Sequence, residues 1–99
     1  MRRKFGPLRT PSKSNLGNLP DGPGVYSLNT ASGKPNYIGK VQRGRAPERI
    51  GEHDRQNKIP FDKFGFIPTK TKDDAASLEK KLIRQHKPPY NDLLKKKPK

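Results

Sequence analysis

The chain contains no cysteine and only two histidines, His53 and His86. Without cysteine it can form neither a disulfide framework nor a thiolate zinc site, and two histidines are too few for a histidine-built metal centre. No apolar run approaches the roughly 20 residues that a membrane-spanning helix needs. Residues 1–5 are basic but precede no apolar segment, which is untypical of a secretory signal. We therefore expect a cytoplasmic protein with no membrane partner.

Hydrophobic and acidic residues are also scarce. Hydrophobic residues make up 27% of the 99 positions, so we expect one domain with a small core. Nine acidic residues stand against 23 Lys and Arg, and residues 24–94 alone keep 14 basic and 8 acidic residues. A polyanion is the natural partner of such a chain, because each neutralised phosphate releases condensed counterions. Charge alone fits a ribosomal-type RNA binder equally well.

The N-terminal segment differs in composition from the rest. Residues 1–23 carry four prolines, three glycines and five Lys or Arg, so little of this segment is expected to pack. We interpret residues 1–18 as a basic, mobile arm, residues 19–94 as the folded domain and residues 95–99 as a basic tail.

Periodicity and turn residues predict three strands and two helices in the domain. The expected order is strand 24–29, strand 36–41, helix 47–57, strand 61–67 and helix 73–87. A proline suits the first turn of the earlier helix, and Thr71 with Asp74 forms a capping box for the later one. The order β-β-α-β-α predicts an α+β fold with a small, mostly antiparallel three-stranded sheet flanked by helices.

An acidic residue stands on the core-facing side of the last helix. On a helical wheel Glu79 falls within the apolar arc of Leu78, Leu82 and Ile83, whereas the basic side chains of this helix lie opposite. A carboxylate there needs a partner or a cation, because burying it alone is costly. A structural salt bridge explains this position, and so does a metal site.

The earlier helix repeats this pattern. Arg49 and His53 lie three and seven residues after Ala46, so they share its stripe and face the sheet. Pairing of Arg49 with Glu79 or Glu52, and simple packing of His53, are the alternatives to a functional role. Tyr26 and Tyr37 lie on adjacent strands, where packing would explain them. Gly24 and Gly39 mark close backbone approach, since glycine weakens a strand interior.

Five short motifs together resemble the GIY-YIG nuclease superfamily, over residues 19–94. They are Gly24-Val25-Tyr26, Tyr37-Ile38-Gly39-Lys40, Arg49-Ile50-x-x-His53, Leu78-Glu79 and Pro89-Tyr90-Asn91. Residues 19–26 and 78–91 look most like the nuclease domain at the start of UvrC-type excision-repair proteins. The loop after Gly39 looks longer than in UvrC-like members, which leaves Arg43 and Arg45 as alternatives for the catalytic arginine. Ile50 and His53 favour Arg49.

The resemblance implies a metal-dependent DNA endonuclease that hydrolyses phosphodiester bonds, with nicking or cleavage of structured or damaged DNA favoured. By position, Glu79 matches the metal-binding glutamate, and the other catalytic residues are Tyr26, Tyr37, Arg49 and His53. Mg²⁺ is the expected cofactor and Mn²⁺ its substitute. The expected nucleic-acid-binding residues are Lys40, Arg43, Arg45 and Asn91, and Gly24 and Gly39 shape the motif. DNA is the expected partner, with a protein partner or a dimer for targeting.

Two other readings of the sequence compete with a nuclease. A non-catalytic basic module that coats or bends nucleic acid explains the net charge, but it does not explain why Glu79 and Arg49 both point inward from different helices. A degenerate nuclease fold used only for docking is disfavoured, because every motif is retained. The nuclease interpretation therefore requires Glu79 and Arg49 to approach each other beside the two tyrosine rings.

Overall fold

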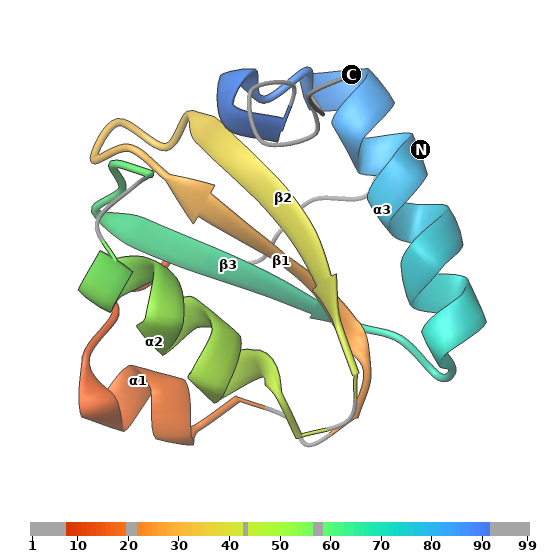
Figure 1. Cartoon of the computed structure of the whole chain (residues 1–99), viewed down its shortest axis with the longest axis horizontal. Coiled ribbons are helices and arrows are strands. Elements are labelled where there is room, and N and C mark those ends of the chain that lie inside the picture. Colours follow the sequence, from red (N-terminus) through yellow and green to blue (C-terminus); the bar gives the residue numbers. More distant parts are fainter. Residues whose placement is uncertain (1–7, 20–21, 43, 57–58, 92–99) are drawn as a thin grey trace.

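The computed structural model describes residues 8–19, 22–42, 44–56 and 59–91. The elements in chain order are α1 (Lys13–Gly17), β1 (Gly24–Asn29), β2 (Pro35–Val41), α2 (Ala46–Gln56), β3 (Lys63–Pro68) and α3 (Lys72–His86). In Figure 1, α1 and α2 lie on one side of the strands and α3 lies on the other. Within the described residues, no helix is both long and apolar enough to cross a membrane.

The three strands form one antiparallel sheet in the order β2-β1-β3. The first two strands pair as an antiparallel hairpin, and the predicted α+β fold with the order β-β-α-β-α is confirmed. β1 occupies the centre and is buried along its whole length. The register places Tyr26 opposite Gly39 on one side and opposite Phe66 on the other.

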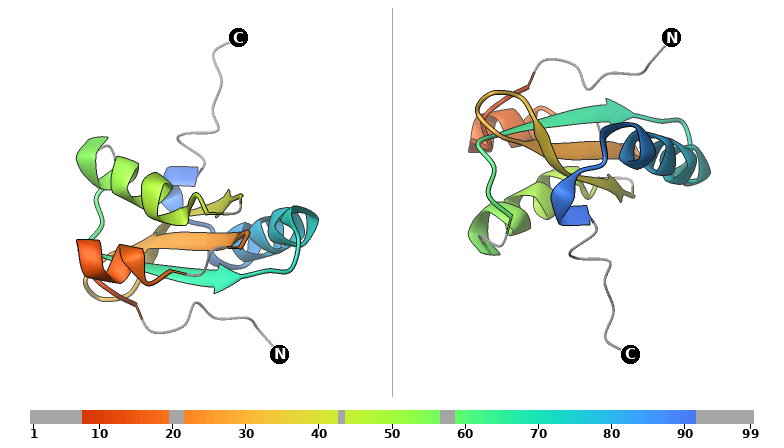
Figure 2. Two further views of the ribbon diagram at one scale, coloured as in Figure 1. Left: turned by 90° about the horizontal axis from the view of Figure 1, so that it is seen from below. Right: turned by 90° about the horizontal axis from the view of Figure 1, so that it is seen from above.

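Each face of the sheet has its own hydrophobic core. Successive side chains of a strand point to opposite faces, so Tyr26 and Leu28 lie on one face and Val25 lies on the other. The first face packs against Ala46 and Ile50 of α2, and the second packs against α3 residues such as Ala75 and Leu82. Figure 2 shows α2 lying over the strands. The face that α2 covers therefore contains Tyr26, the first tyrosine of the predicted site.

The two long helices begin and end within one residue of the prediction, as far as the described residues allow. The Thr71 side chain caps α3 by accepting a hydrogen bond from the Asp74 backbone N–H at 3.0 Å. Lys87 ends α3 in the left-handed conformation, with φ 49°, immediately before Pro88. These caps fix the start and the end of the helix that carries Glu79.

The expectation that little of residues 1–23 packs is wrong for residues 8–19. α1 forms there, with Ser12 accepting a hydrogen bond from the Asn15 backbone N–H at 3.2 Å. Leu16 and Leu19 pack against the core on the α2 side, and the backbone of Arg9 pairs with that of Phe64. Leu16 near the end of α1 and Leu19 just beyond it thus anchor this short segment to the core despite its prolines. Residues 1–7 and 95–99 lie outside the described residues, and the predicted domain boundaries stay a prediction.

Candidate active site

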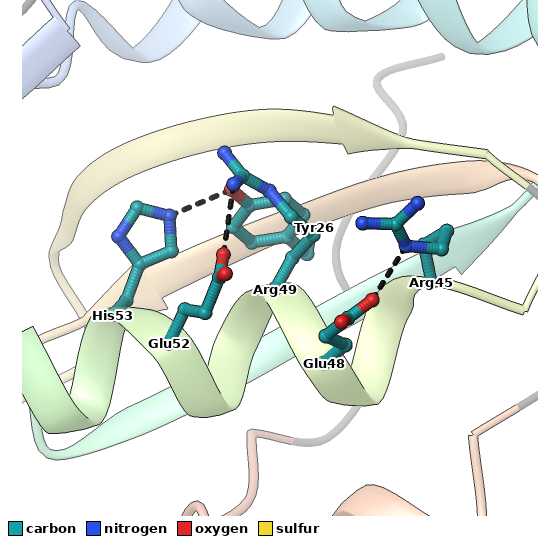
Figure 3. A network of polar contacts seen from close by, with 6 residues as sticks. All are labelled: Tyr26, Arg45, Glu48, Arg49, Glu52 and His53. Carbon is teal, nitrogen blue, oxygen red and sulfur yellow. Dashed lines mark hydrogen bonds and ion pairs between the residues drawn. The ribbon is translucent and has the colours of Figure 1, made fainter.

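Tyr26 lies among polar side chains that come from β1, β2 and α2. Its hydroxyl oxygen lies 2.9 Å from Nε2 of His53, and Figure 3 shows this contact. The ring centroid of Tyr37 lies 6.1 Å from that of Tyr26 and 5.2 Å from that of His53. Three rings from three elements thus form one cluster, which we call the aromatic cluster (Tyr26, Tyr37 and His53).

Gly39 makes room for the phenol of Tyr26. A Cβ atom at Gly39 would lie 2.6 Å from the Tyr26 hydroxyl oxygen, closer than real contacts allow. At Gly24 a Cβ atom would lie 2.5 Å from the carbonyl oxygen of Ile67 and equally close to the Phe66 ring. The predicted close approach at both glycines is confirmed. The missing side chain at Gly39 lets the Tyr26 ring lie across β2.

Arg49 is the arginine that joins the aromatic cluster. Its Nη1 lies 2.9 Å from Oε1 of Glu52, and its guanidinium lies beside the Tyr26 hydroxyl (Figure 3). Arg45 instead forms an ion pair with Glu48 at 2.6 Å and lies apart from Tyr26. Of the alternatives for the catalytic arginine, Arg43 lies outside the described residues. Glu52 pairs with Arg49 and so positions its guanidinium. The sequence signals this pairing, because residues three apart on a helix are neighbours.

The protonation states of the aromatic cluster follow from burial. Burial raises the pKa of Tyr26 well above its usual range, Tyr37 adds to this rise, and the positive charge of Arg49 opposes it. Burial also lowers the pKa of His53 below 6.5, and Arg49 adds to that effect. At neutral pH both side chains are therefore uncharged. With the imidazole protonated at Nδ1, the Tyr26 hydroxyl donates its hydrogen bond to Nε2 of His53.

Glu79 lies on the other side of β2 from α2, next to Lys40. Its side chain is 20% exposed, and its Oε1 lies 3.6 Å from Nζ of Lys40. Burial raises the pKa of Tyr37, the negative charge of Glu79 raises it further, and the positive charge of Arg49 lowers it. Glu79 and Arg49 are thus both close enough to Tyr37 to act on its titration. The partner expected for Glu79 is present, and it is Lys40 from the neighbouring strand.

The residues around Glu79 suit a weakly anchored, well-hydrated cation. Among the described residues, no group of three or more His, Cys, Asp or Glu side chains could enclose a metal ion. Mg²⁺ does not need such a group, since it keeps several waters and is bound through one or two carboxylates and substrate phosphates. Glu79 offers one partly exposed carboxylate beside the tyrosines. This donor set fits Mg²⁺ and does not fit a zinc centre.

Asn91, which the sequence analysis assigns to nucleic-acid binding, lies buried against β2. Its side chain is 4% exposed. Its Oδ1 accepts a hydrogen bond from the Ile38 N–H, and its Nδ2 donates one to the Ile38 carbonyl oxygen, each at 2.8 Å. Burial and two backbone partners favour a structural role for Asn91 over a phosphate contact, and its assignment to nucleic-acid binding stays a prediction. It positions β2 between Tyr37 and Gly39.

Two other predicted phosphate-binding residues, Lys40 and Arg45, are accessible. The side chains of Lys40 and Arg45 are 53% and 55% exposed. Both line a shallow surface depression together with Gln42 and Arg49. The sequence analysis did not single out Gln42, and nothing in its local pattern distinguishes it from other loop residues. The depression opens beside the catalytic candidates, where a backbone phosphate could enter.

The chain matches known proteins along most of its length. The profile of the family described as "UvrC-like GIY-YIG domain" matches residues 22–92. UvrABC system protein C of Clostridium acetobutylicum is 36% identical over 90 residues, which cover 81% of this chain and 14% of that protein. The corresponding protein of Moorella thermoacetica is 36% identical over 89 residues, 84% of this chain and 14% of its own length. The chain thus spans about one seventh of these relatives.

The fold has solved counterparts. The magnesium-bound GIY-YIG N-terminal endonuclease domain of UvrC from Thermotoga maritima superposes with a TM-score of 0.63 at 27% identity. The match covers 79% of this chain and 92% of that domain. A point mutant of the same domain, bound to its catalytic divalent cation, gives a TM-score of 0.64. By sequence and by fold, the chain belongs to the family of UvrC-like GIY-YIG nuclease domains.

Proposed function

We propose that this domain is an endonuclease that uses one divalent cation to hydrolyse phosphodiester bonds in DNA. The observation that carries this proposal is the placement of Tyr26, His53 and Arg49 against one another, with the Glu79 carboxylate close enough to act on Tyr37. The Thermotoga maritima domain, an endonuclease domain bound to a catalytic magnesium ion, supports it.

Glu79 is the residue that would hold the cation. Mg²⁺ bound there would polarise the scissile phosphate and stabilise the departing 3′ oxygen. Lys40, at 3.6 Å from the carboxylate, restrains Glu79 at the edge of β2, and this ion pair offsets part of the Lys40 charge that would otherwise attract a phosphate. Mn²⁺ is proposed as a substitute, because the same oxygen donors suit it.

Arg49 stabilises the charge that develops on the phosphate. A guanidinium offers two parallel N–H donors to phosphate oxygens, which a lysine ammonium cannot do. The ion pair with Glu52 holds Arg49 in place before DNA binds, so less order must be imposed during the reaction. Lys40 and Arg45 contact the flanking phosphates. Tyr37 supports the other two rings of the aromatic cluster, Tyr26 and His53, by packing against them.

Tyr26 and His53 activate the attacking water. The Tyr26 oxygen accepts a proton from the water while the Tyr26 hydroxyl proton passes to Nε2 of His53, 2.9 Å away. Tyr26 is thus a neutral phenol before and after the step, which suits a buried side chain whose pKa is raised. His53 takes up the proton as an imidazolium, which it later returns to solvent from its partly buried position. His53 is favoured over Lys40 as the group that assists Tyr26, because His53 contacts the Tyr26 hydroxyl whereas Lys40 is engaged with Glu79.

The substrate within this class is proposed from the relatives. Their membership of the UvrABC system supports structured or damaged DNA as the substrate and a protein partner for targeting. A dimer of this chain is the alternative means of targeting. Cleavage of a panel of nicked, branched, damaged and linear duplexes, with and without a partner protein, distinguishes these substrates.

Plasmid cleavage tests the proposed function directly. Supercoiled plasmid is incubated with the protein in Mg²⁺, in Mn²⁺ and in EDTA, alongside the Glu79→Gln variant. We expect nicked product in both metals and none in EDTA or with the variant. Retarded but intact plasmid in every lane would show that the protein binds DNA without cleaving it, and the proposal would then be wrong.

A further inference from the structure

Four neighbouring surface depressions lead from the candidate active site to the first turns of α3. The depression that contains Arg49 shares Lys40 and Gln42 with a second one, which reaches Lys72. Gln42 and Lys72 also line a third depression, and that one shares Thr69 and Lys70 with a fourth, which ends at Ser77 and Lys81. We call this continuous path the basic groove, after its six basic lining residues: Lys40, Arg45, Arg49, Lys70, Lys72 and Lys81.

The charge of the basic groove is strongly positive. Against its six basic side chains, the depressions are lined by two acids, Asp73 and Asp74. Both acids lie in the first turn of α3, where the positive end of the helix dipole offsets part of their charge. Lys70, Lys72 and Lys81 are exposed and form no ion pair with another described residue. Three cations are therefore free to meet an anion outside the catalytic candidates.

We propose that the basic groove binds the DNA backbone on one side of the scissile phosphate, with Lys70, Lys72 and Lys81 contacting successive phosphates. This proposal rests on the proposed function, since it concerns the substrate of the same site. The lysines fit a polyanion whose charges recur along a line, because each can neutralise one phosphate. Gln42, where three of the depressions meet, donates an amide hydrogen bond to the strand as it leaves Arg49.

The side chains of the basic groove suit recognition of DNA that does not depend on base sequence. Lysines and an amide that reach phosphates give affinity and register without reading base edges. The groove leads away from Arg49 in one direction, towards α3. Binding should therefore require DNA to extend on one side of the cleavage position, whatever its sequence.

The first test compares two double variants of equal charge. Lys70→Ala/Lys72→Ala removes two lysines of the groove, and Lys34→Ala/Lys80→Ala removes two exposed lysines that line none of its depressions. DNA binding is measured by fluorescence anisotropy in EDTA over a range of salt concentrations. The slope of log affinity against log salt should fall by roughly 1.8 in the groove variant, at about 0.9 for each lost phosphate contact on duplex DNA, and should stay unchanged in the control.

The second test adds charge without removing a lysine. Gln42→Glu places a carboxylate where the depressions meet, and Gln56→Glu makes the same change at the exposed end of α2. We expect Gln42→Glu to raise KM and Kd about tenfold, because like charges across an interface repel, and Gln56→Glu to leave both unchanged. Equal effects of the two substitutions would contradict the proposal that the basic groove binds DNA.

The third test locates the DNA directly. The chain has no cysteine, so Ser77→Cys, at the far end of the groove, can be labelled uniquely with an iron chelate that cuts nearby DNA. Ser32→Cys, in the exposed turn between β1 and β2, is the matched control. Cuts from position 77 on one side only of the scissile phosphate support the groove. Cuts on both sides, or the same cuts from position 32, overturn it.

The outcomes separate this proposal from the proposed function. If the parent protein cleaves DNA but the groove and control variants behave alike, the groove is wrong and the nuclease assignment stands. If the parent protein neither binds nor cleaves any DNA of the panel, the proposed function fails and the groove fails with it.

Discussion

The hydroxyl of Tyr26 and Nε2 of His53 lie 2.9 Å apart, although 27 residues separate them in the chain. β1 fixes the phenol and α2 fixes the imidazole, so the distance depends on the packing of that helix on the sheet. Both groups are uncharged at neutral pH, because burial raises the pKa of Tyr26 and lowers that of His53. Transfer of the Tyr26 proton to His53 therefore avoids a buried phenolate only if the Tyr26 oxygen takes a proton from the attacking water in the same step.

Tyr26→Phe tests this contact with the smallest change. The variant keeps the ring but loses the hydroxyl, so kcat should fall by about 10²- to 10⁴-fold, as expected for a lost proton-transfer group. The Kd for DNA in EDTA should stay near that of the parent protein. Tyr90→Phe removes a hydroxyl outside the aromatic cluster and serves as the control. If Tyr26→Phe retains the parent rate, Tyr26 is a packing residue.

The pH dependence of cleavage should report His53. Only the neutral imidazole can accept the Tyr26 proton, and burial together with Arg49 lowers the pKa of His53. The rate should therefore be constant through neutral pH and fall on acidification, with an apparent pKa below 6.5. His53→Gln keeps a hydrogen-bond acceptor but no base, so it should be slow at every pH and lose this dependence. An unchanged profile in His53→Gln would assign the titration to another group.

The same shift has a consequence for stability. The folded protein binds the His53 proton more weakly than the unfolded chain does, so the unfolded state gains protons first on acidification. The contribution of neutral His53 to the free energy of unfolding is complete above pH 6.5. It is lost as the pH falls through the lower pKa that His53 has in the folded state. Urea unfolding of the parent protein and of His53→Gln at about pH 7 and about pH 5 measures it. The parent should lose more stability between these two values.

Arg49 and Arg45 should respond differently to substitution. Arg49→Lys keeps the charge but loses the planar pair of donors, so kcat should fall by about 10²-fold or more while DNA binding changes little. Arg45→Ala should raise Kd and leave kcat near the parent value, because Arg45 pairs with Glu48 apart from Tyr26. Single-turnover cleavage separates the two effects. The opposite result would move the catalytic role to Arg45.

Glu79→Gln should abolish metal-dependent cleavage without weakening DNA binding. The amide keeps the shape of the side chain but cannot supply the negative charge that a hydrated Mg²⁺ requires. Removal of the carboxylate also frees Lys40, now 3.6 Å from it, so affinity for DNA in EDTA should be equal or higher. Titration of Mg²⁺ against the cleavage rate checks the metal role. A variant that cleaves at the parent rate in Mg²⁺ would exclude Glu79 as the ligand.

Asn91→Ala should act on stability. The substitution leaves the N–H and the carbonyl group of Ile38 without their partners, and each unsatisfied buried group costs about 1–3 kcal/mol. Chemical unfolding should show a loss of that order. Asn91→Asp retains the acceptor for the Ile38 N–H, but its ionised carboxylate has no donor for the Ile38 carbonyl oxygen, so this variant should be destabilised near neutral pH and regain stability when acidification protonates the carboxylate. A stable Asn91→Ala with weakened DNA binding would support the assignment to nucleic-acid contact.

The elements that the sequence predicts are those with strong local signals. The strand at residues 24–29 and the capping residue Thr71 are predicted from local features, and both agree with the structure. α1 has too few residues to show a helical period, so Leu16 within it and Leu19 just after it are recognisable only from what they pack against. A short segment can thus become ordered by a core that is formed elsewhere in the chain.

Within the site, the sequence predicts which residues face inward but not which ones pair. The helical wheel places Glu79 on the inner face, yet its partner Lys40 depends on how α3 crosses β2. Asn91 lies 53 residues from Ile38, and no local pattern distinguishes an asparagine that completes a strand edge from one that binds a phosphate. Long-range pairings of this kind are set by the tertiary fold.

The hydrogen bonds between Asn91 and Ile38 also affect self-association. β2 and β3 are the edges of the sheet, where unpaired backbone groups invite strands from other molecules. The Asn91 amide occupies those groups at Ile38, and the backbone of Arg9 occupies those at Phe64. Each edge is thus blocked at one point by a segment from an end of the domain, so a truncation that removes either segment should favour aggregation through the exposed strand.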